Sequence, residues 1–483
     1  MDQPSAPEAP PTPAPSTGKG MWIGLIVVVI VIVILLAAVF GGLLGPPEEQ
    51  VLKIGTVMSI TGRLSPFGPS NRNAATMAVE EINAATGGVL GRPIQLYNQD
   101  DATDPTTART AAATLISQNR VDAIIGATGS GQCKQVLEVA KANGVFEVSG
   151  SCTSPEFSNT TLTGGWWART APSDSLQGAV AAFYAHSNTN LSFARAAVMG
   201  TNDAYGRGLA QVFNDKFIAL GGTITTNSPR IITPTPTATD YTLDLEAVLE
   251  VNPTPQLVYL VAYPDDGVLM VKNWQDGIPT HSAAWRNVFW LFSEGLFDQT
   301  GFIDKARNAP NNVDVHLFEG TAPAAFGGIY GPTYAAFAQR YRARWGQNTT
   351  LFDDNYYDAA ALIALAAQAA GSATGAAIKS KIREVATPPG VKIFPGMWKQ
   401  AFENLSKGND IDYEGASGGV NIDLLGDPKS GYIVWGVNDT TLHWFTKEMF
   451  NETFVSGLAP APPLPAPGTR GDVWMPVVRT ESE

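Results

Sequence analysis

From residue 51 onward, short apolar runs alternate with amphipathic stretches, and this alternation restricts the possible fold more than any other feature of the sequence. Strands are predicted at VLKIGTVMS, PIQLYNQD, VDAIIGAT and GVFEVSGS, and helices between them at NAATMAVEEINAAT, PTTARTAAATLISQN and CKQVLEVAKANG. Strands that alternate with helices form a parallel sheet covered on both faces. Asp104 is the expected N-cap of the second helix, with Pro105 at its first position. The pattern predicts one open sheet, complete by about residue 170.

A second alternating series predicts a second α/β lobe. Its segments are ARAAVMG, AYGRGLAQVFNDKFIALGG, TDYTLDLEAVLEV, QLVYLVAY, DDGVLMVKNWQDG and NVFWLFSEG. Helical patterns follow at GPTYAAFAQRYRARWG, NYYDAAALIALAAQAAG and GAAIKSKIREVA, and GGVNIDLLGDPKSGYIVWGVN is predicted to form a turn plus strands. A chain of this length is expected to divide into more than one core. The segments left over after two lobes predict that the chain crosses between them more than once.

Residues 21–45 form an apolar run without a charged or polar side chain. At about 1.5 Å per residue, a helix of this length spans a hydrocarbon core of roughly 30 Å. The apolar region of a cleaved signal peptide is shorter, roughly 7–15 residues, so we expect an uncleaved membrane anchor. Lys19 precedes the run and Glu48 and Glu49 follow it, which directs the N-terminus to the cytoplasm. The Lys19-Gly20 pair resembles a pilin-type processing site, which leaves processing of the anchor open.

The charge of the chain argues against binding of nucleic acid, and its content of Cys and His argues against a structural metal site. The chain has 31 Lys and Arg against 44 Asp and Glu, a net charge of −13, so it offers no basic face to nucleic acid. Its two cysteines cannot build a four-thiolate zinc or iron–sulfur site, and its four histidines form no close pair. No metal and no cofactor is therefore expected.

The motifs of common enzyme classes are also missing from the sequence. G-x-S-x-G occurs once, at 415–419, but the segment that follows, VNIDLLGD, is predicted to be a strand ending in a turn rather than the helix of a nucleophile elbow. No G-x-x-x-x-G-K-[ST], G-x-G-x-x-G or H-E-x-x-H is present. We therefore expect a binding protein with no catalytic residues.

The order of motifs resembles the type 1 periplasmic solute-binding proteins, in particular the branched-chain amino-acid (Leu/Ile/Val) binding branch of ABC transporters. The resemblance is carried by KIGTVMSITGRLSPFG, AVEEINAATGGVLGRPI, DDATDP, GATGSG, SGSCTSPEF, RTAPSD, NDAYGRG, DYTLDL, VAYPDDG, SEG, EGTAP, YYDAAALIALA and YEGASGGVNIDLLGD. It implies a Venus-flytrap fold: two doubly wound α/β lobes joined by three crossovers, with a small ligand between them. On this template the chain divides into a disordered Pro-rich cytoplasmic tail (1–20), an anchor (21–45), a first lobe (51–172 and 322–420), a second lobe (173–321 and 421–456) and a Pro-rich C-terminal tail (457–483).

The carboxylate of an amino acid is well held by backbone N–H groups and hydroxyls at the N-terminus of a helix. Two loops that follow neighbouring predicted strands, at 129–131 and 151–153, carry such groups. The resemblance assigns ligand-binding positions to Ser130, Ser151, Cys152 and Thr153, with Ser130 and Thr153 on the carboxylate-binding hydroxyls. Without the resemblance, these would be ordinary Gly and Ser turn residues.

The ligand's ammonium group requires an anion, and Glu294 in the segment SEG comes just after the apolar strand VFWLF. The resemblance implies that Glu294 binds the ammonium and that Tyr205 and Tyr263 of the second lobe close over the ligand. Phe67 occupies a position where Leu/Ile/Val-binding members often have tyrosine, which leaves the ligand's side chain open. If the resemblance does not hold, Glu294 is a surface residue that caps the end of the strand, and the two tyrosines pack in the core or at the rim of the cleft.

Cys133 and Cys152 lie at the ends of two neighbouring predicted strands, and an exported setting permits a disulfide between them. The proteins that the chain resembles usually place any bridge elsewhere, and Thr103 stands where some of them have a cysteine. A Cys133–Cys152 disulfide and two buried free thiols both remain open.

The resemblance implies a receptor on the outer side of the cell membrane that delivers a branched-chain or other small amino acid to an ABC permease. Two alternatives remain. One is a sensing ectodomain that signals through a partner, and the other is a binder of an amide, urea or aromatic acid.

Overall fold

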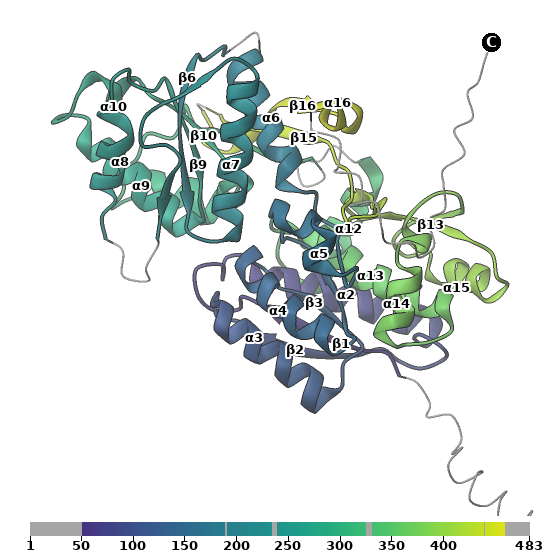
Figure 1. The fold of residues 1–483 in the computed structure, drawn as a ribbon. Helices are drawn as coiled ribbons and strands as arrows, with labels where there is room; N and C mark the ends of the chain where they lie inside the picture. Colours follow the sequence, from purple (N-terminus) through teal and green to yellow (C-terminus); the bar gives the residue numbers. More distant parts are fainter. Residues whose placement is uncertain (1–50, 189–190, 234–238, 325–330, 439, 459–483) are drawn as a thin grey trace, which may run out of the picture. The chain divides into compact units, whose positions relative to one another are not determined.

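The computed structural model describes residues 51–188, 191–233, 239–324, 331–438 and 440–458 (Figure 1). The expected tail at 1–20, the expected anchor at 21–45 and the chain from residue 459 onward lie outside the described residues. Within those ranges, no single helix is long and apolar enough to cross a membrane. One pair of helices joined by a sharp bend, Asp353–Ala370 and Gly375–Lys381, meets the requirement by length and composition.

A parallel sheet of five strands forms the centre of the first lobe. The strands are β1 (Lys53–Met58), β2 (Gln95–Asp100), β3 (Ala123–Gly126), β4 (Phe146–Ser149) and β5 (Trp167–Arg169). They lie in the order β2-β1-β3-β4-β5, and each neighbouring pair is parallel. The sheet ends at Arg169, as the apolar runs predict.

Helices cover both faces of this sheet. The pair α2 (Gly68–Thr86) and α13 (Asp353–Ala370) packs on one face, and the pair α3 (Pro105–Thr114) and α4 (Ser130–Ala142) packs on the other. The side chain of Asp104 accepts a hydrogen bond from the Thr107 N–H at 2.7 Å, which confirms the predicted N-cap of α3. Because α13 packs on α2, a segment nearly 300 residues later in the chain completes the first lobe.

The second lobe is built on a sheet of eight strands, mostly parallel. The strands are β6 (Arg195–Thr201), β7 (Thr223–Ile224), β8 (Arg230–Ile232), β9 (Leu257–Val261), β10 (Phe289–Phe292), β11 (Glu319–Pro323), β15 (Tyr432–Val437) and β16 (Trp444–Phe450). Their main order is β16-β15-β11-β10-β9-β6-β7, with β8 paired to β6. The last two strands, β15 and β16, run antiparallel to their neighbours.

Helices also flank the second sheet, and Figure 1 shows β6 and β9 between α7 and the pair α8 and α9. The helices are α6 (Asp174–Ser187), α7 (Ala204–Ala219), α8 (Thr242–Leu249), α9 (Pro264–Gly277), α10 (Ala283–Asn287) and α16 (Glu452–Leu458). Both sheets therefore have the doubly wound form that the alternating pattern predicts.

The chain passes between the lobes after β5, after β11 and before β15. Because β11 belongs to the second sheet, the second crossing lies beyond Pro323 and not at the expected boundary between 321 and 322. Residues 421–427 remain with the first lobe, where the Arg169 N–H donates to the Gly426 carbonyl at 2.9 Å. The third crossing therefore falls between residues 427 and 432 rather than after residue 420.

Part of the C-terminal pattern differs from its prediction. The expected strand VNIDLLGD (420–427) is wrong, because the structure has a loop there. The carboxylate of Asp423 accepts hydrogen bonds from the N–H groups of Leu425 (2.8 Å) and Asp427 (3.0 Å). Such a turn uses backbone donors that a strand would need. A small sheet and two short helices nearby add β12 (Val391–Ile393), β13 (Ile411–Gly415), β14 (Gly418–Gly419), α14 (Gly375–Lys381) and α15 (Trp398–Ser406).

Candidate functional site

A small cavity lies between the two lobes, where loops follow the carboxyl ends of the parallel strands. Its lining comprises Leu64, Phe67, Asn71, Thr128, Gly129, Ser130, Ser151, Leu351 and Phe352 of the first lobe with Tyr205, Tyr263, Glu294 and Gly295 of the second. Ligands of open α/β sheets bind at such strand ends. The cavity volume of about 30 Å³ admits about two water molecules. An amino acid needs more space, so the lobes or lining side chains must move to admit one.

The first lobe contributes hydroxyl groups to this cavity. Ser130 is the first residue of α4, and Ser151 follows β4. The hydroxyl of Ser151 donates to the Thr128 carbonyl at 2.7 Å and lies 2.7 Å from the Tyr356 hydroxyl. The Ser130 hydroxyl accepts from the Ser154 N–H at 3.3 Å. The first N–H groups of a helix lack partners within the helix and attract anions, so this wall suits a carboxylate.

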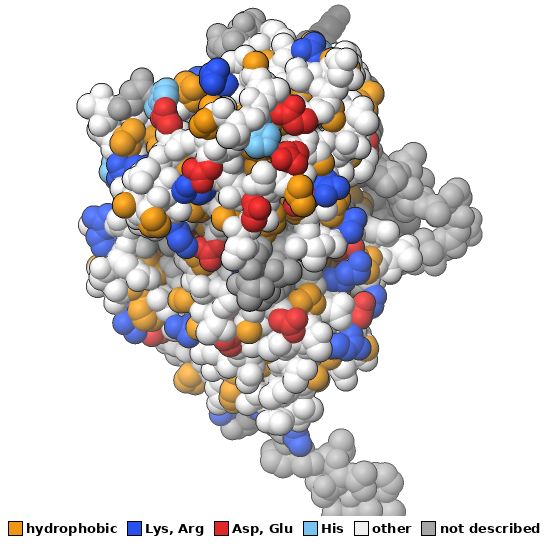
Figure 2. All heavy atoms as spheres, turned by 90° about the vertical axis from the view of Figure 1, so that its left-hand side faces the viewer, with side chains coloured by type: hydrophobic (Ala, Val, Ile, Leu, Met, Phe, Trp, Pro, Cys, Tyr) orange, Lys and Arg blue, Asp and Glu red, His pale blue; other side chains and the backbone are white. Residues whose placement is uncertain are grey.

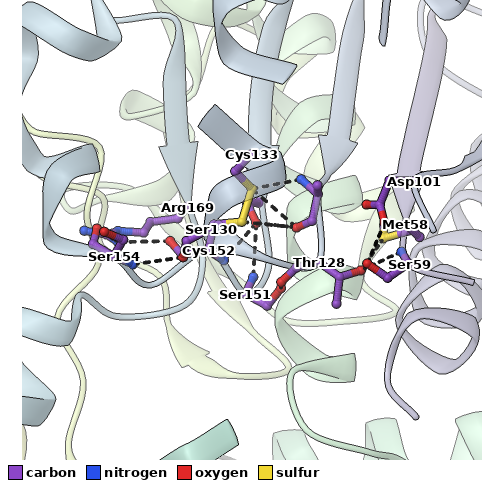
Figure 3. Close-up of a disulfide and its surroundings, with 12 residues drawn as sticks. Met58, Ser59, Asp101, Thr128, Ser130, Cys133, Ser151, Cys152, Ser154 and Arg169 are labelled. Atoms are coloured by element: carbon purple, nitrogen blue, oxygen red, sulfur yellow. Dashed lines mark hydrogen bonds between the residues drawn. A yellow bond between two sulfur atoms is a disulfide. The ribbon is translucent and has the colours of Figure 1, made fainter. Parts of the chain in front are cut away.

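A disulfide joins Cys133 of α4 to Cys152 in the loop after β4 (Figure 3). The structure therefore contains the bridge, the first of the two alternatives that the sequence leaves open. Both cysteines are fully buried. Figure 3 shows the bridge beside Ser130 and Ser151, so the covalent link connects the two hydroxyl-bearing loops of the cavity.

Two predicted site residues, Cys152 and Thr153, do not line the cavity. The sulfur of Cys152 is bonded to Cys133, and Thr153 is buried, with its carbonyl accepting from the Asp174 N–H at 2.8 Å. Their loop is held by Arg169, whose guanidinium donates to the Cys152 carbonyl at 3.0 Å and to the Ser154 carbonyl at 2.9 Å. The carboxylate contact expected of Thr153 stays a prediction.

Glu294 brings a buried carboxylate to the second-lobe wall. It begins a short 3-10 turn one residue beyond β10 and is 2% exposed. Its Oε2 accepts a hydrogen bond from Gln177 Nε2 at 2.7 Å. Burial raises the pKa of Glu294 to about 7. A cationic group that enters the cavity would stabilise the ionised form.

A second carboxyl group, Asp174, lies close enough to Glu294 for the two charges to interact. Asp174 begins α6, and its side chain is fully buried. Burial, and then the charge of Glu294, raise the pKa of Asp174 well above its usual value. A charge on either of these two carboxyl groups therefore disfavours ionisation of the other. The sequence analysis missed Asp174 and Gln177, which the first crossing brings to Glu294.

Two aromatic rings complete the second-lobe wall. Tyr205 and Tyr263 are stacked, with ring centroids 5.5 Å apart and an interplanar angle of 22°. The Tyr205 hydroxyl donates to the Ser293 hydroxyl at 2.9 Å. Arg63 of the first lobe lies over the Tyr263 ring at 5.6 Å and forms an ion pair with Asp266 at 2.9 Å. The second-lobe wall is thus tied to the first lobe by Arg63.

The remaining lining is largely apolar and was mostly missed by the sequence analysis. Phe67 was predicted as a site residue. Its carbonyl accepts a hydrogen bond from the N–H of Asn71, which lies one helical turn later. Residues one turn apart share a helix face, so this spacing could have identified Asn71 as a lining residue. Leu351 and Phe352 immediately precede α13, and Leu64 comes from the loop after β1. The return of α13 to the first lobe has no local signal, so its contribution could not be inferred from periodicity.

Neither a metal site nor a nucleophile emerges from the described ranges. They contain no group of three or more His, Cys, Asp or Glu side chains that could hold a metal ion. In the G-x-S-x-G segment, the Ser417 hydroxyl donates to buried Asp358 at 2.6 Å, and Asp358 also accepts from the Ala416 N–H at 2.8 Å. These bonds fix the β13–β14 turn. On the face drawn in Figure 2, acidic and basic side chains are interspersed rather than gathered into a basic surface.

Comparison with known proteins yields a consistent group of relatives. The family model described as periplasmic binding protein matches residues 51–277. The chain is 25% identical over 423 residues to the chemotactic signal transduction system substrate-binding protein BasB of Halobacterium salinarum, covering 84% of this chain and 91% of BasB. It is 33% identical over 183 residues to the Leu/Ile/Val-binding protein BraC3 of Rhizobium johnstonii, a match that covers 38% of this chain and 48% of BraC3.

The fold also matches a solved structure, and the match covers nearly the whole of that structure. The leucine-binding protein LivK of Thermotoga maritima superposes with a TM-score of 0.65 at 23% identity, covering 83% of this chain and 99% of LivK. At this identity the likeness concerns the fold alone. The two-lobed architecture inferred from the alternating pattern is thus the one that this relative has.

Proposed function

Because this chain belongs, through residues 51–277, to the periplasmic binding protein family, we propose that it is the solute-binding protein of an ABC transporter. Its proposed ligand is a branched-chain or other small amino acid, held between the two lobes and delivered to a permease. The relatives support this class: BraC3 and LivK are named as binders of Leu/Ile/Val and of leucine. Neither relative is named as an enzyme.

The observation that carries the proposal is the chemistry of the two walls of the cavity. One wall has the hydroxyl of Ser130 at the N-terminus of α4 and the hydroxyl of Ser151 in the loop after β4, and the other has the buried carboxylate of Glu294. A zwitterion needs donors for its carboxylate and an acceptor with negative charge for its ammonium. An amino acid placed between the walls satisfies both, whereas a simple sugar would leave Glu294 buried without a cation.

Closure of the lobes is the proposed output. The ligand binds one lobe first, and contacts with the second lobe form only when the cleft closes. A ligand that makes more contacts in the closed state shifts the population toward it. The permease then recognises the closed protein, as hinge closure around a ligand allows in other binding proteins.

The proposal is tested with the full chain in detergent, first by a thermal-shift screen of amino acids, small amides, urea and aromatic acids. Glu294→Gln is then titrated by calorimetry with the strongest amino-acid ligand. Loss of the charged partner of a buried ammonium should cost about 3–5 kcal/mol of binding free energy. Glu138→Gln, an exposed substitution in α4, is the matched control and should bind normally. Unchanged affinity in Glu294→Gln, or stabilisation by urea or aromatic acids alone, would refute the amino-acid assignment.

A second candidate function is sensing through a signalling partner. It is favoured by BasB, which is named as part of a chemotactic signal transduction system and matches this chain over 91% of its own length. Deletion of the gene in its own organism separates the two functions. Loss of amino-acid uptake supports transport, and loss of chemotaxis with normal uptake supports sensing.

The apolar run at 21–45 supports a membrane tether that holds the binding domain on the outer side of the membrane. Removal of residues 1–50 should release the protein from the membrane fraction without altering ligand affinity. A truncated chain that still sediments with membranes would contradict the tether.

A further inference from the structure

We propose that Asn71 selects ligands whose neutral side chain carries a hydroxyl or an amide N–H. The inference rests on the proposed function, because it concerns the side-chain end of the same cavity, and it narrows the class of amino acid. Asn71 lies in α2, is fully buried and lines the cavity.

Hydrogen bonds fix which end of the Asn71 amide is available to a ligand. Its Nδ2 donates to the Leu351 carbonyl at 3.0 Å and to Oδ1 of Asp353 at 2.8 Å. The Leu351 carbonyl can only accept, so the amide nitrogen must face it and the opposite orientation is excluded. Both amide hydrogens are thereby used to join α2 to the start of α13.

The amide oxygen of Asn71 is left without a partner. Among the described residues that line the cavity, it is the one buried side-chain oxygen or nitrogen with no hydrogen bond. A buried acceptor without a donor is costly. A donor on a bound ligand would remove that cost, and an alkyl group in the same place would retain it.

The surroundings of Asn71 distinguish the ligand's side chain from its charged groups. Leu64, Phe67, Leu351 and Phe352 line the first-lobe part of the cavity with Asn71 and disfavour a charged side chain. Glu294 is the stronger acceptor for the ammonium, and Ser130 and Ser151 serve the carboxylate. The Asn71 oxygen is then the acceptor that remains for the side chain.

Threonine and valine provide a matched pair of probes because they have the same shape and differ by a hydroxyl in place of a methyl group. The full chain in detergent is titrated with L-threonine and L-valine by calorimetry. We expect wild-type protein to bind threonine about tenfold more tightly, since a site built to hydrogen-bond a hydroxyl rejects the analogue that lacks it. Asn71→Ala should bring the two affinities within about twofold of each other.

Ser70→Ala is the matched control. Ser70 donates to Asp353 at 2.5 Å, so the substitution disturbs the same network without removing the Asn71 oxygen. It should keep the preference for threonine even where it lowers the melting temperature. A melting curve of Asn71→Ala shows whether the variant is folded, and the ratio of two affinities in one variant is insensitive to a general loss of binding.

Valine binding as tightly as threonine or more tightly would overturn the selection by Asn71 while leaving the proposed function intact. An equal loss of both affinities in Asn71→Ala would also overturn it, because that result would place the amide oxygen at a group common to both ligands. Failure of both probes and of the whole amino-acid screen would refute the proposed function, and the selection with it.

Discussion

Two carboxyl groups buried side by side decide how the cavity responds to protons. Neighbouring carboxylates in a dry site do not ionise together, because each raises the pKa of the other. Asp174 has the more strongly raised pKa, and the pKa of Glu294 is about 7. Gln177 donates to Glu294 and partly offsets its burial. Ionisation of both carboxyl groups in the empty site is therefore disfavoured.

We expect ligand affinity to depend on pH through Glu294. An ammonium binds the ionised carboxylate, so below about pH 7 binding must release a proton, and above it no proton is released. The dissociation constant for the amino acid should rise up to about tenfold per pH unit as the pH falls from 7 toward 6, and should level off above pH 8.

Calorimetry in buffers of different ionisation enthalpy measures the released proton directly. Glu294→Gln has no proton to release and should show a flat profile over the same range. An equally steep profile in this variant would assign the titration to another group.

Some site residues could be predicted because they leave a local signature in the sequence. Glu294 is a charged residue at the end of an apolar strand, and Ser130 lies in a Gly-Ser-Gly segment between a strand and a helix. Asp174 and Asn71 have no such signature. Their burial depends on contacts with Glu294 and with the start of α13, which are set by how the chain crosses between lobes.

At the scale of elements, the disulfide links helix α4 to the loop after β4 beneath the cavity. Two hydrogen bonds make the same connection: Ser151 to the Thr128 carbonyl, and the Ser154 N–H to Ser130. These bonds involve the hydroxyls that the ligand is proposed to contact. The disulfide joins the loops without occupying those hydroxyls.

Cys133→Ala with Cys152→Ala should therefore reduce both stability and local order. The bridge closes a loop with a sequence separation of 19, and its loss should lower the free energy of unfolding by about 3 kcal/mol. Urea unfolding measures that loss. Hydrogen exchange in the folded protein should accelerate at residues 127–131 and 150–154 and remain unchanged in the second lobe. A loss of stability without faster local exchange would mean that the bridge does not hold these loops.

Most helices and strands could be predicted, and the exceptions have physical reasons. The parallel strands are continuous apolar runs buried on both faces, which makes them visible in the sequence. The segment VNIDLLGD has the same apolar character, but Asp423 captures the N–H groups of Leu425 and Asp427 and prevents a strand. The short sheet of β12, β13 and β14 is held by nonlocal pairing, as in the parallel register of Val391 with Ile411.

At the scale of the whole molecule, an ion pair between described residues joins the lobes beside the cavity. Arg63 lies in the loop after β1, and Asp266 lies in the first turn of α9. The Asp266 side chain is 6% exposed and also accepts from the Tyr241 hydroxyl at 2.9 Å. An ion pair across the cleft stabilises the closed arrangement and has no counterpart once the lobes separate.

Arg63→Ala should accelerate ligand release about three- to tenfold with little change in the association rate. Stopped-flow measurement of intrinsic fluorescence gives both rates. Arg109→Ala is the control, because Arg109 pairs with Glu138 within the first lobe at an exposed site. Equal effects of the two substitutions would show that Arg63 acts through general charge and not through the cleft.

The order of the strands also determines when each lobe can be completed as the chain is synthesised. The first sheet waits for α13, which ends at Ala370, and the second waits for β15 and β16, which end at Phe450. Until then, β11 presents an unpaired edge to other chains. Nearly the whole chain must therefore leave the ribosome before the second lobe can finish folding, and a premature stop near residue 430 would yield a product prone to aggregation rather than a working half.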